Sequence, residues 1–68
     1  MATENKIGEN IKKHRIKLGL SQEDFAQKSG VKYTTLTKIE SGVIKTPSVL
    51  MVEKIAKALD VSIEELIR

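Results

Sequence analysis

Residues that start and stop helices divide this chain into five short segments. Three glycines each follow a stretch of helical periodicity, where helices commonly end in left-handed backbone: Gly19, Gly30 and Gly42. Three serines precede such stretches, where a hydroxyl can accept hydrogen bonds from the free N–H groups of a first turn: Ser21, Ser48 and Ser62. Helical periodicity recurs throughout, and no segment alternates like a strand. The pattern therefore predicts an all-α protein, a compact domain of five helices.

The expected helices lie at about 5–18, from 22 to Gly30, at 33–41, after Ser48 and after Ser62. In the first, Ile7, Ile11 and Leu18 share one stripe with Arg15. The fourth has a buried face at positions i, i+3, i+4 and i+7: Val52, Ile55, Ala56 and Leu59. Capping-box spacing occurs at Ser21–Asp24, with Asp in place of the usual Glu, and at Ser62–Glu65. We expect one domain over residues 1–68, with a flexible N-terminus at residues 1–5.

Composition narrows the classes of protein that this chain can be. Its 68 residues include no Cys and one His, and no apolar run approaches the ~20 residues that span a bilayer. Disulfides, thiolate metal sites and a membrane span are therefore not expected, and no signal-peptide pattern is present. The serines are explained as caps, and His14 has no catalytic partner nearby in the sequence. We expect a cytoplasmic binding protein with no enzymatic activity, no metal and no cofactor.

Basic residues are concentrated in one part of the chain. Between residues 11 and 45 there are eight basic and three acidic residues, whereas residues 46–68 contain three basic and four acidic ones. A basic part suits a polyanion such as nucleic acid, and a near-neutral part suits a different contact. Charge alone leaves open an ordinary solvated, lysine-rich surface.

The second and third segments have the pattern of a helix-turn-helix, with the motif at about residues 22–41. Phe25 points into the core, Ala26 is small where two helices cross, and Gly30 suits the turn. The inner side of the next helix is apolar: Val31, Leu36 and Ile39. This combination is typical of DNA-binding proteins.

Residues 7–67 resemble the phage repressor and Cro, or XRE-like, family of helix-turn-helix regulators. The resemblance lies in RIKLGLSQEDFAQKSGVKYTTLTKIESG and TPSVLMVEKIAKALDVSIEEL. It implies a lambda-repressor-like fold and a transcriptional regulator or repressor. Two positions depart from the family pattern: Ser29 replaces a frequent apolar residue, and Lys32 stands at an N-cap where Ser or Thr is usual. The loop after Gly42 is about one residue longer than in many relatives.

Helical geometry separates the two faces of the third helix. At 100° per residue Thr35, Leu36 and Ile39 face inward, which leaves an outward face that can enter a major groove. Four outward residues are predicted to contact bases: Tyr33, Thr34, Thr37 and Lys38. An exposed aromatic packed on a neighbour and an ordinary polar helix surface are the alternatives for Tyr33 and the threonines.

A second group of residues is predicted to contact the DNA backbone. Gln22 lies in the first turn of a helix, which favours an anion, and the resemblance implies that it grips a phosphate. Further candidates are Lys17, Lys32, Ser41, Lys45 and Thr46. For each lysine, a solvated charge is the alternative. The resemblance also implies an ion pair between Arg15 and Glu40 that would orient the third helix against the first.

Apolar residues beyond those that the core needs suggest a homodimer interface: Val43, Ile44, Leu50, Met51, Ile63 and Ile67. The alternative is that half of them complete the core. The predicted function is binding of double-stranded DNA at a (pseudo)palindromic operator by a homodimer. A protein-binding adaptor on the same fold, or an antitoxin with a toxin partner, is the competing hypothesis.

Overall fold

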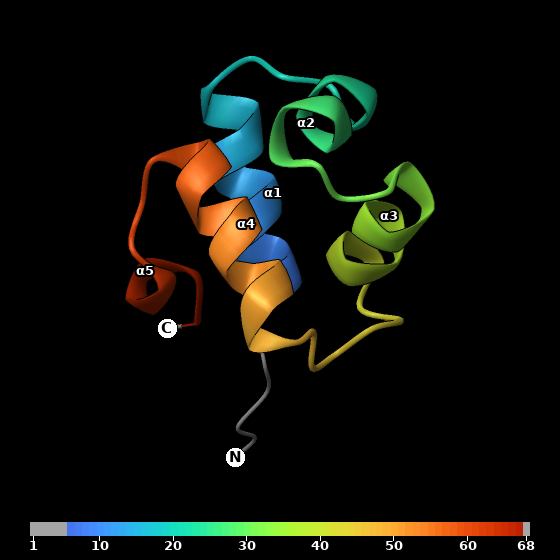
Figure 1. The fold of residues 1–68 in the computed structure, drawn as a ribbon, viewed down its shortest axis with the longest axis vertical. Coiled ribbons are helices and arrows are strands. Elements are labelled where there is room, and N and C mark those ends of the chain that lie inside the picture. Colours follow the sequence, from blue (N-terminus) through green and yellow to red (C-terminus); the bar gives the residue numbers. More distant parts are fainter. Residues whose placement is uncertain (1–5, 68) are drawn as a thin grey trace.

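The computed structural model describes residues 6–67, which form five helices and no strand (Figure 1). The helices are α1 (Ile7–Lys17), α2 (Gln22–Ser29), α3 (Tyr33–Ser41), α4 (Val49–Leu59) and α5 (Ile63–Ile67). The predicted all-α class and the order of five helices are confirmed. Residues 1–5, where a flexible N-terminus was expected, lie outside the described residues.

Serine caps begin three of the helices. The Ser21 hydroxyl accepts a hydrogen bond from the Asp24 N–H at 3.0 Å, and Ser48 caps α4 in the same way. At α5 the capping box is complete, because the Ser62 N–H donates to Glu65 and the Glu65 N–H donates back to the Ser62 hydroxyl, both at 3.2 Å. These local bonds explain why the helix starts are readable from the sequence.

In the view of Figure 1, α4 crosses in front of α1. In that view α2 and α3 lie on one side of α4, and α5 lies on the other. α1 packs against α3, α4 and α5, while α2 packs against α3 and α4. Within residues 6–67, no helix has the length and apolar character that crossing a membrane requires. The arrangement leaves the outer side of α3 uncovered.

One apolar core connects all five helices. Its buried members are Ile7, Ile11, Phe25, Ala26, Val31, Leu36, Ile39, Val52, Ile55, Ala56, Leu59 and Leu66. Every apolar residue predicted to face inward in α2, α3 and α4 belongs to this core. The second and third helices are therefore fixed to α1 and α4 by buried side chains, which makes their mutual angle a property of the whole fold.

The prediction for the end of the first helix was wrong at Leu18. This side chain is 50% exposed and does not join the stripe of Ile7 and Ile11. The helix ends at Lys17, and the chain then turns through left-handed backbone at Gly19 (φ 74°). Because of this turn, Leu20 is the residue that packs against the core at this end of α1.

Candidate nucleic-acid interface

The two faces of α3 differ sharply in burial. Leu36 and Ile39 are fully buried, whereas Tyr33 is 47% exposed and Thr34 and Lys38 are also exposed. Thr37, the fourth predicted base contact, is half-buried. Two inward apolar anchors hold α3 in place while its other side offers hydroxyl groups and an ammonium group to the solvent. A polar helix face of this kind has hydrogen-bonding groups suited to base edges.

The C-terminal end of α3 rests on a glycine that the sequence analysis did not single out. Gly8 is buried in α1, and a Cβ atom there would overlap the carbonyl oxygen of Ile39 and lie 3.1 Å from that of Glu40. The backbones of α1 and α3 are therefore in direct contact. A glycine inside an otherwise helical segment costs about 1 kcal/mol relative to alanine, so its presence away from any turn signal is the feature that could have pointed to a packing role.

The N-terminal end of α3 has no side-chain cap. Lys32 occupies the N-cap position with extended backbone (φ −59°, ψ 140°) and makes no capping hydrogen bond. α3 therefore begins without the Ser or Thr cap that is usual in the family. The consequence is that free N–H groups of the first turn and an exposed lysine lie at the same helix end, and both favour an anion.

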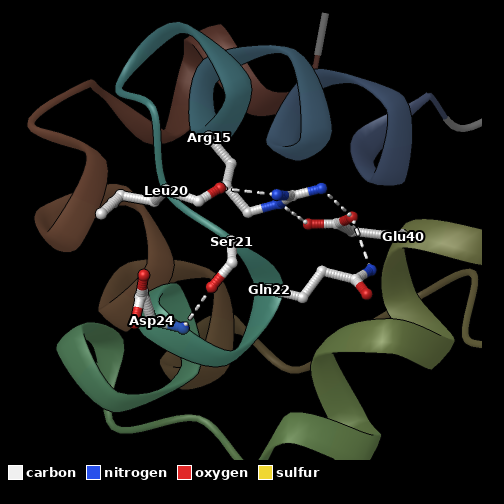
Figure 2. Close-up of polar contacts among 6 residues, drawn as sticks. All are labelled: Arg15, Leu20, Ser21, Gln22, Asp24 and Glu40. Atoms are coloured by element: carbon white, nitrogen blue, oxygen red, sulfur yellow. Dashed lines mark hydrogen bonds and ion pairs between the residues drawn. The ribbon is translucent and has the colours of Figure 1, made fainter.

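A buried ion pair joins α1 to α3 (Figure 2). The Arg15 Nε donates to Glu40 Oε2 at 2.8 Å, and Nη2 donates to Oε1 at 3.2 Å. The side chains of Arg15 and Glu40 are 10% and 3% exposed, and Nη1 of the arginine also donates to the Leu20 carbonyl oxygen at 2.7 Å. The guanidinium thus connects α1, the loop before α2 and the last turn of α3. Such a two-pronged bond restricts orientation as well as distance.

Gln22 has a partner that the sequence reasoning missed. Its Nε2 donates to Glu40 Oε1 at 3.0 Å, so the first turn of α2 is tied to the same carboxylate (Figure 2). An ionised carboxylate accepts hydrogen bonds and cannot donate them, which determines the orientation of the Gln22 amide. Glu40 accepts one N–H of that amide. The second N–H is the donor that Gln22 has for another acceptor.

The other predicted backbone contacts come from three separate parts of the chain. Lys17 ends α1, Lys32 precedes α3, and Lys45 and Thr46 lie in the loop before α4, and all four side chains are exposed. Ser41 is exposed as well, but its hydroxyl donates to the Lys38 carbonyl oxygen at 3.2 Å. Its hydroxyl proton is thus occupied within the helix.

The apolar residues predicted for a dimer interface divide into two groups. Ile44 and Met51 pack against the core, so their main contribution is to the fold of the chain itself. The others are exposed by 38–71%: Val43, Leu50, Ile63 and Ile67. Val49, which the sequence analysis left out of this set, is 75% exposed. With Ile63 and Ile67 it lines an apolar hollow between the start of α4 and α5.

A further tie of α5 was not predicted. The Asn10 side chain donates from Nδ2 to the carbonyl oxygen of Leu66 at 2.7 Å, which joins α1 to the end of the described chain. Among the described residues no group of three His, Cys, Asp or Glu side chains has an arrangement that could hold a metal ion. Side-chain hydrogen bonds between helices thus include the Arg15–Glu40–Gln22 network and the bond from Asn10.

The fold and the exposed face of its third helix define a helix-turn-helix protein. The model of the helix-turn-helix family HTH_3 matches residues 11–66, and this chain belongs to that family. The transcriptional regulator SinR of Bacillus subtilis is 38% identical over 61 residues, which cover 90% of this chain and 55% of SinR. The chain thus spans about half the length of this curated relative.

Solved structures agree with the family assignment. A crystal structure of SinR in complex with DNA has a TM-score of 0.86 and 38% identity, covering 88% of this chain and 95% of that chain. The restriction-modification controller protein C.AhdI from Aeromonas hydrophila has a TM-score of 0.84 and 34% identity, covering 90% and 91% of the two chains. SinR has also been solved as a complex with the protein SinI, at a TM-score of 0.85 and 38% identity, over 88% of this chain and 58% of that one.

Proposed function

We propose that this chain is a sequence-specific DNA-binding transcriptional regulator that inserts α3 into the major groove of double-stranded DNA. The single observation that carries the proposal is the geometry of α3, whose inner face is fully buried while its outer face is polar and basic. An exposed recognition helix of this length fits the major groove. Membership of the helix-turn-helix family and the likeness to SinR bound to DNA support it.

Base reading is assigned to the outward residues of α3. Tyr33 and Thr34, at the start of the helix, reach base edges first, and Thr37 and Lys38 follow one turn later. The Lys38 ammonium donates to acceptors such as the O6 and N7 atoms of guanine. These contacts specify the sequence and supply a modest share of the affinity.

Phosphate contacts position the protein on the duplex. The second N–H of the Gln22 amide donates to a phosphate oxygen while the first remains bound to Glu40. Because Glu40 also receives two N–H groups from Arg15, α1, α2 and α3 approach the DNA as one rigid unit. Lys17, Lys32 and Lys45 add charge around this unit, with a further backbone contact from Thr46. A contact from Ser41 requires its hydroxyl to exchange the Lys38 carbonyl oxygen for a phosphate oxygen.

Two copies of the chain bind a (pseudo)palindromic operator. One recognition helix reads only a few base pairs, and a two-fold dimer doubles the contact with half-sites about 34 Å, or ~10 bp, apart. The exposed apolar side chains near α4 and α5 support this assembly: Val43, Val49, Leu50, Ile63 and Ile67. All of them except Val43 lie in residues 46–68, the part of the chain that carries little net charge.

A salt titration tests DNA binding against the competing adaptor or antitoxin function. A regulator that neutralises several phosphates should lose affinity for mixed duplex fragments steeply and log-linearly between about 50 and 200 mM salt. An adaptor that reads only protein would bind these fragments weakly or not at all at every salt concentration. Weak binding of this second kind would overturn the proposal.

Two substitutions test the division between reading and positioning. Lys38→Ala should cost about 1–3 kcal/mol at one base position and relax the preference there. Gln22→Ala should weaken binding to all duplexes alike, because phosphates are the same in every sequence. Affinities for a panel of duplexes that differ at single positions measure both effects. Equal losses from both variants on every duplex would contradict this assignment.

A further inference from the structure

The Thr37 hydroxyl in the recognition helix has its proton occupied. Its Oγ1 lies 2.8 Å from the Thr34 carbonyl oxygen, one turn earlier in α3. A carbonyl oxygen can only accept, so the threonine must be the donor in this bond. The hydroxyl therefore has lone pairs, and no proton, left for a partner outside the helix.

This polarity restricts which bases Thr37 can read. In the major groove guanine presents two acceptors, N7 and O6, whereas adenine presents its N6 amino group and cytosine its N4 amino group as donors. A hydroxyl that can only accept makes no hydrogen bond with N7 or O6 of guanine, whereas it can accept one from an amino group. Thr37 therefore differs from its neighbour Lys38, whose ammonium is a pure donor.

The Thr37 methyl group decides between the two amino-bearing bases. Adenine is paired with thymine, whose C5 methyl lies in the same groove and packs well against the methyl of a threonine. Cytosine is paired with guanine, which offers no methyl group. An A·T pair thus offers a donor to the Thr37 hydroxyl and a methyl group to the Thr37 methyl.

We propose that Thr37 is a specificity-determining residue that selects an A·T base pair, with its hydroxyl accepting from adenine N6 and its methyl contacting the thymine methyl. The inference rests on the proposed function, in which the outer face of α3 enters the major groove. What it adds to that function is the direction of one hydrogen bond, from the Thr37 hydroxyl to the Thr34 carbonyl oxygen. That direction turns a general polar contact into a choice of base pair.

Selection from random duplex DNA, carried out with the wild-type chain and with Thr37→Val, tests this inference. Valine has the same shape, keeps a methyl group and has no acceptor. We expect the wild-type selection to enrich A·T at one position of each half-site, and Thr37→Val to lower that preference by roughly three- to tenfold, the value of one hydrogen bond. Thr37→Ser, which keeps the oxygen and loses the methyl, should still disfavour guanine but should discriminate less between adenine and cytosine.

Thr35→Val is the matched control, because Thr35 is half-buried like Thr37 but lies toward the inner side of α3 by helical periodicity. Its substitution should leave every base preference unchanged. Thermal unfolding of each variant checks that the helix is intact, and both residues are only half-buried. Enrichment of guanine or cytosine at the position that Thr37→Val alters would overturn the A·T assignment. An identical enriched sequence for the two proteins would overturn it as well, since the hydroxyl would then read nothing. Failure of the wild-type chain to enrich any sequence would instead overturn the proposed function, and this inference with it.

Discussion

Gly8 illustrates how one residue sets the position of a whole helix. Its missing side chain lets α1 touch the carbonyl groups of Ile39 and Glu40 at the end of α3. Helix propensity alone would favour alanine by about 1 kcal/mol at this site. The close backbone contact therefore outweighs a local preference, and it lies at the C-terminal end of the helix that is proposed to read DNA.

Gly8→Ala should lower the free energy of unfolding by about 1–3 kcal/mol, because the added methyl overlaps backbone that cannot move without shifting α3. Urea denaturation followed by circular dichroism measures the change. Lys12→Ala, an exposed substitution in the same helix, is the control and should stay within about 0.5 kcal/mol of the wild type. A stabilised Gly8→Ala protein would show that the two backbones are not in contact.

Arg15 and Glu40 test a second property of single residues, the burial of charge. Arg15→Met should cost about 3–5 kcal/mol, because it leaves the Glu40 carboxylate buried without its cation. That loss is close to the entire stability expected of a domain this small. Equilibrium unfolding gives the value.

The double variant Arg15→Met with Glu40→Leu completes the cycle. Removing both charges should restore much of the lost stability, since no unpaired charge then remains in the interior. A double variant as unstable as Arg15→Met alone would indicate that shape, and not charge pairing, determines the contribution of this site. The double variant should bind DNA more weakly than the wild type, because Gln22 has lost the carboxylate that orients its amide.

The helices differ in how well their ends are capped. α2 and α4 have serine caps and α5 has a complete capping box, whereas neither α1 nor α3 has a side-chain cap. The element proposed to read DNA thus begins with a first turn that no side chain caps. This arrangement weakens α3 locally and leaves its N–H groups available to an anion.

Lys32→Ser should therefore stabilise the protein by about 0.5–2 kcal/mol, because the extended backbone at this position already suits an N-cap. The same variant should bind DNA more weakly, since it removes a positive charge from the start of α3. Thermal unfolding and a binding titration together measure the opposite changes. An unchanged unfolding temperature for Lys32→Ser would contradict this account of the uncapped turn.

Ser21→Ala is the comparison variant. It removes the cap of α2 and should destabilise the protein by about 1 kcal/mol.

Considered as a whole, the molecule has two surfaces of different character. The exposed face of α3 and its flanking lysines form one, and the apolar side chains around the hollow between α4 and α5 form the other. This separation suits a protein that contacts DNA with one surface and its own copy with the other. The second surface is smaller than the sequence suggested, because Ile44 and Met51 are used by the core.

Leu50→Glu tests the proposed homodimer. Leu50 is 71% exposed, so the substitution should leave the free energy of unfolding of the single chain nearly unchanged while repelling a second copy. Sedimentation equilibrium should show a shift toward monomer, and affinity for a two-half-site duplex should fall more than affinity for a single half-site. Ile44→Glu is the contrasting variant, which should unfold the protein because Ile44 packs against the core. Unchanged mass and unchanged two-site affinity for Leu50→Glu would refute an interface at this residue.

The helices and most of the core were readable from the sequence because their causes are local. A serine followed by free N–H groups, a glycine with positive φ and apolar residues at helical spacing each act within a few neighbouring positions. For this reason α3 has the bounds that its pattern predicts, and its inner and outer faces separate at Leu36 and Ile39 as expected.

The tertiary structure decided the features that depend on residues distant in the chain. The bond from Gln22 to Glu40, the contact of Gly8 with the end of α3, the exposure of Leu18 and the burial of Ile44 all follow from how the helices meet. Composition and periodicity do not reveal contacts between residues that are distant in the chain, because they describe one segment at a time. The sequence alone thus determined which face of α3 is polar, and only the packed fold determined how rigidly that face is held and which atoms it presents.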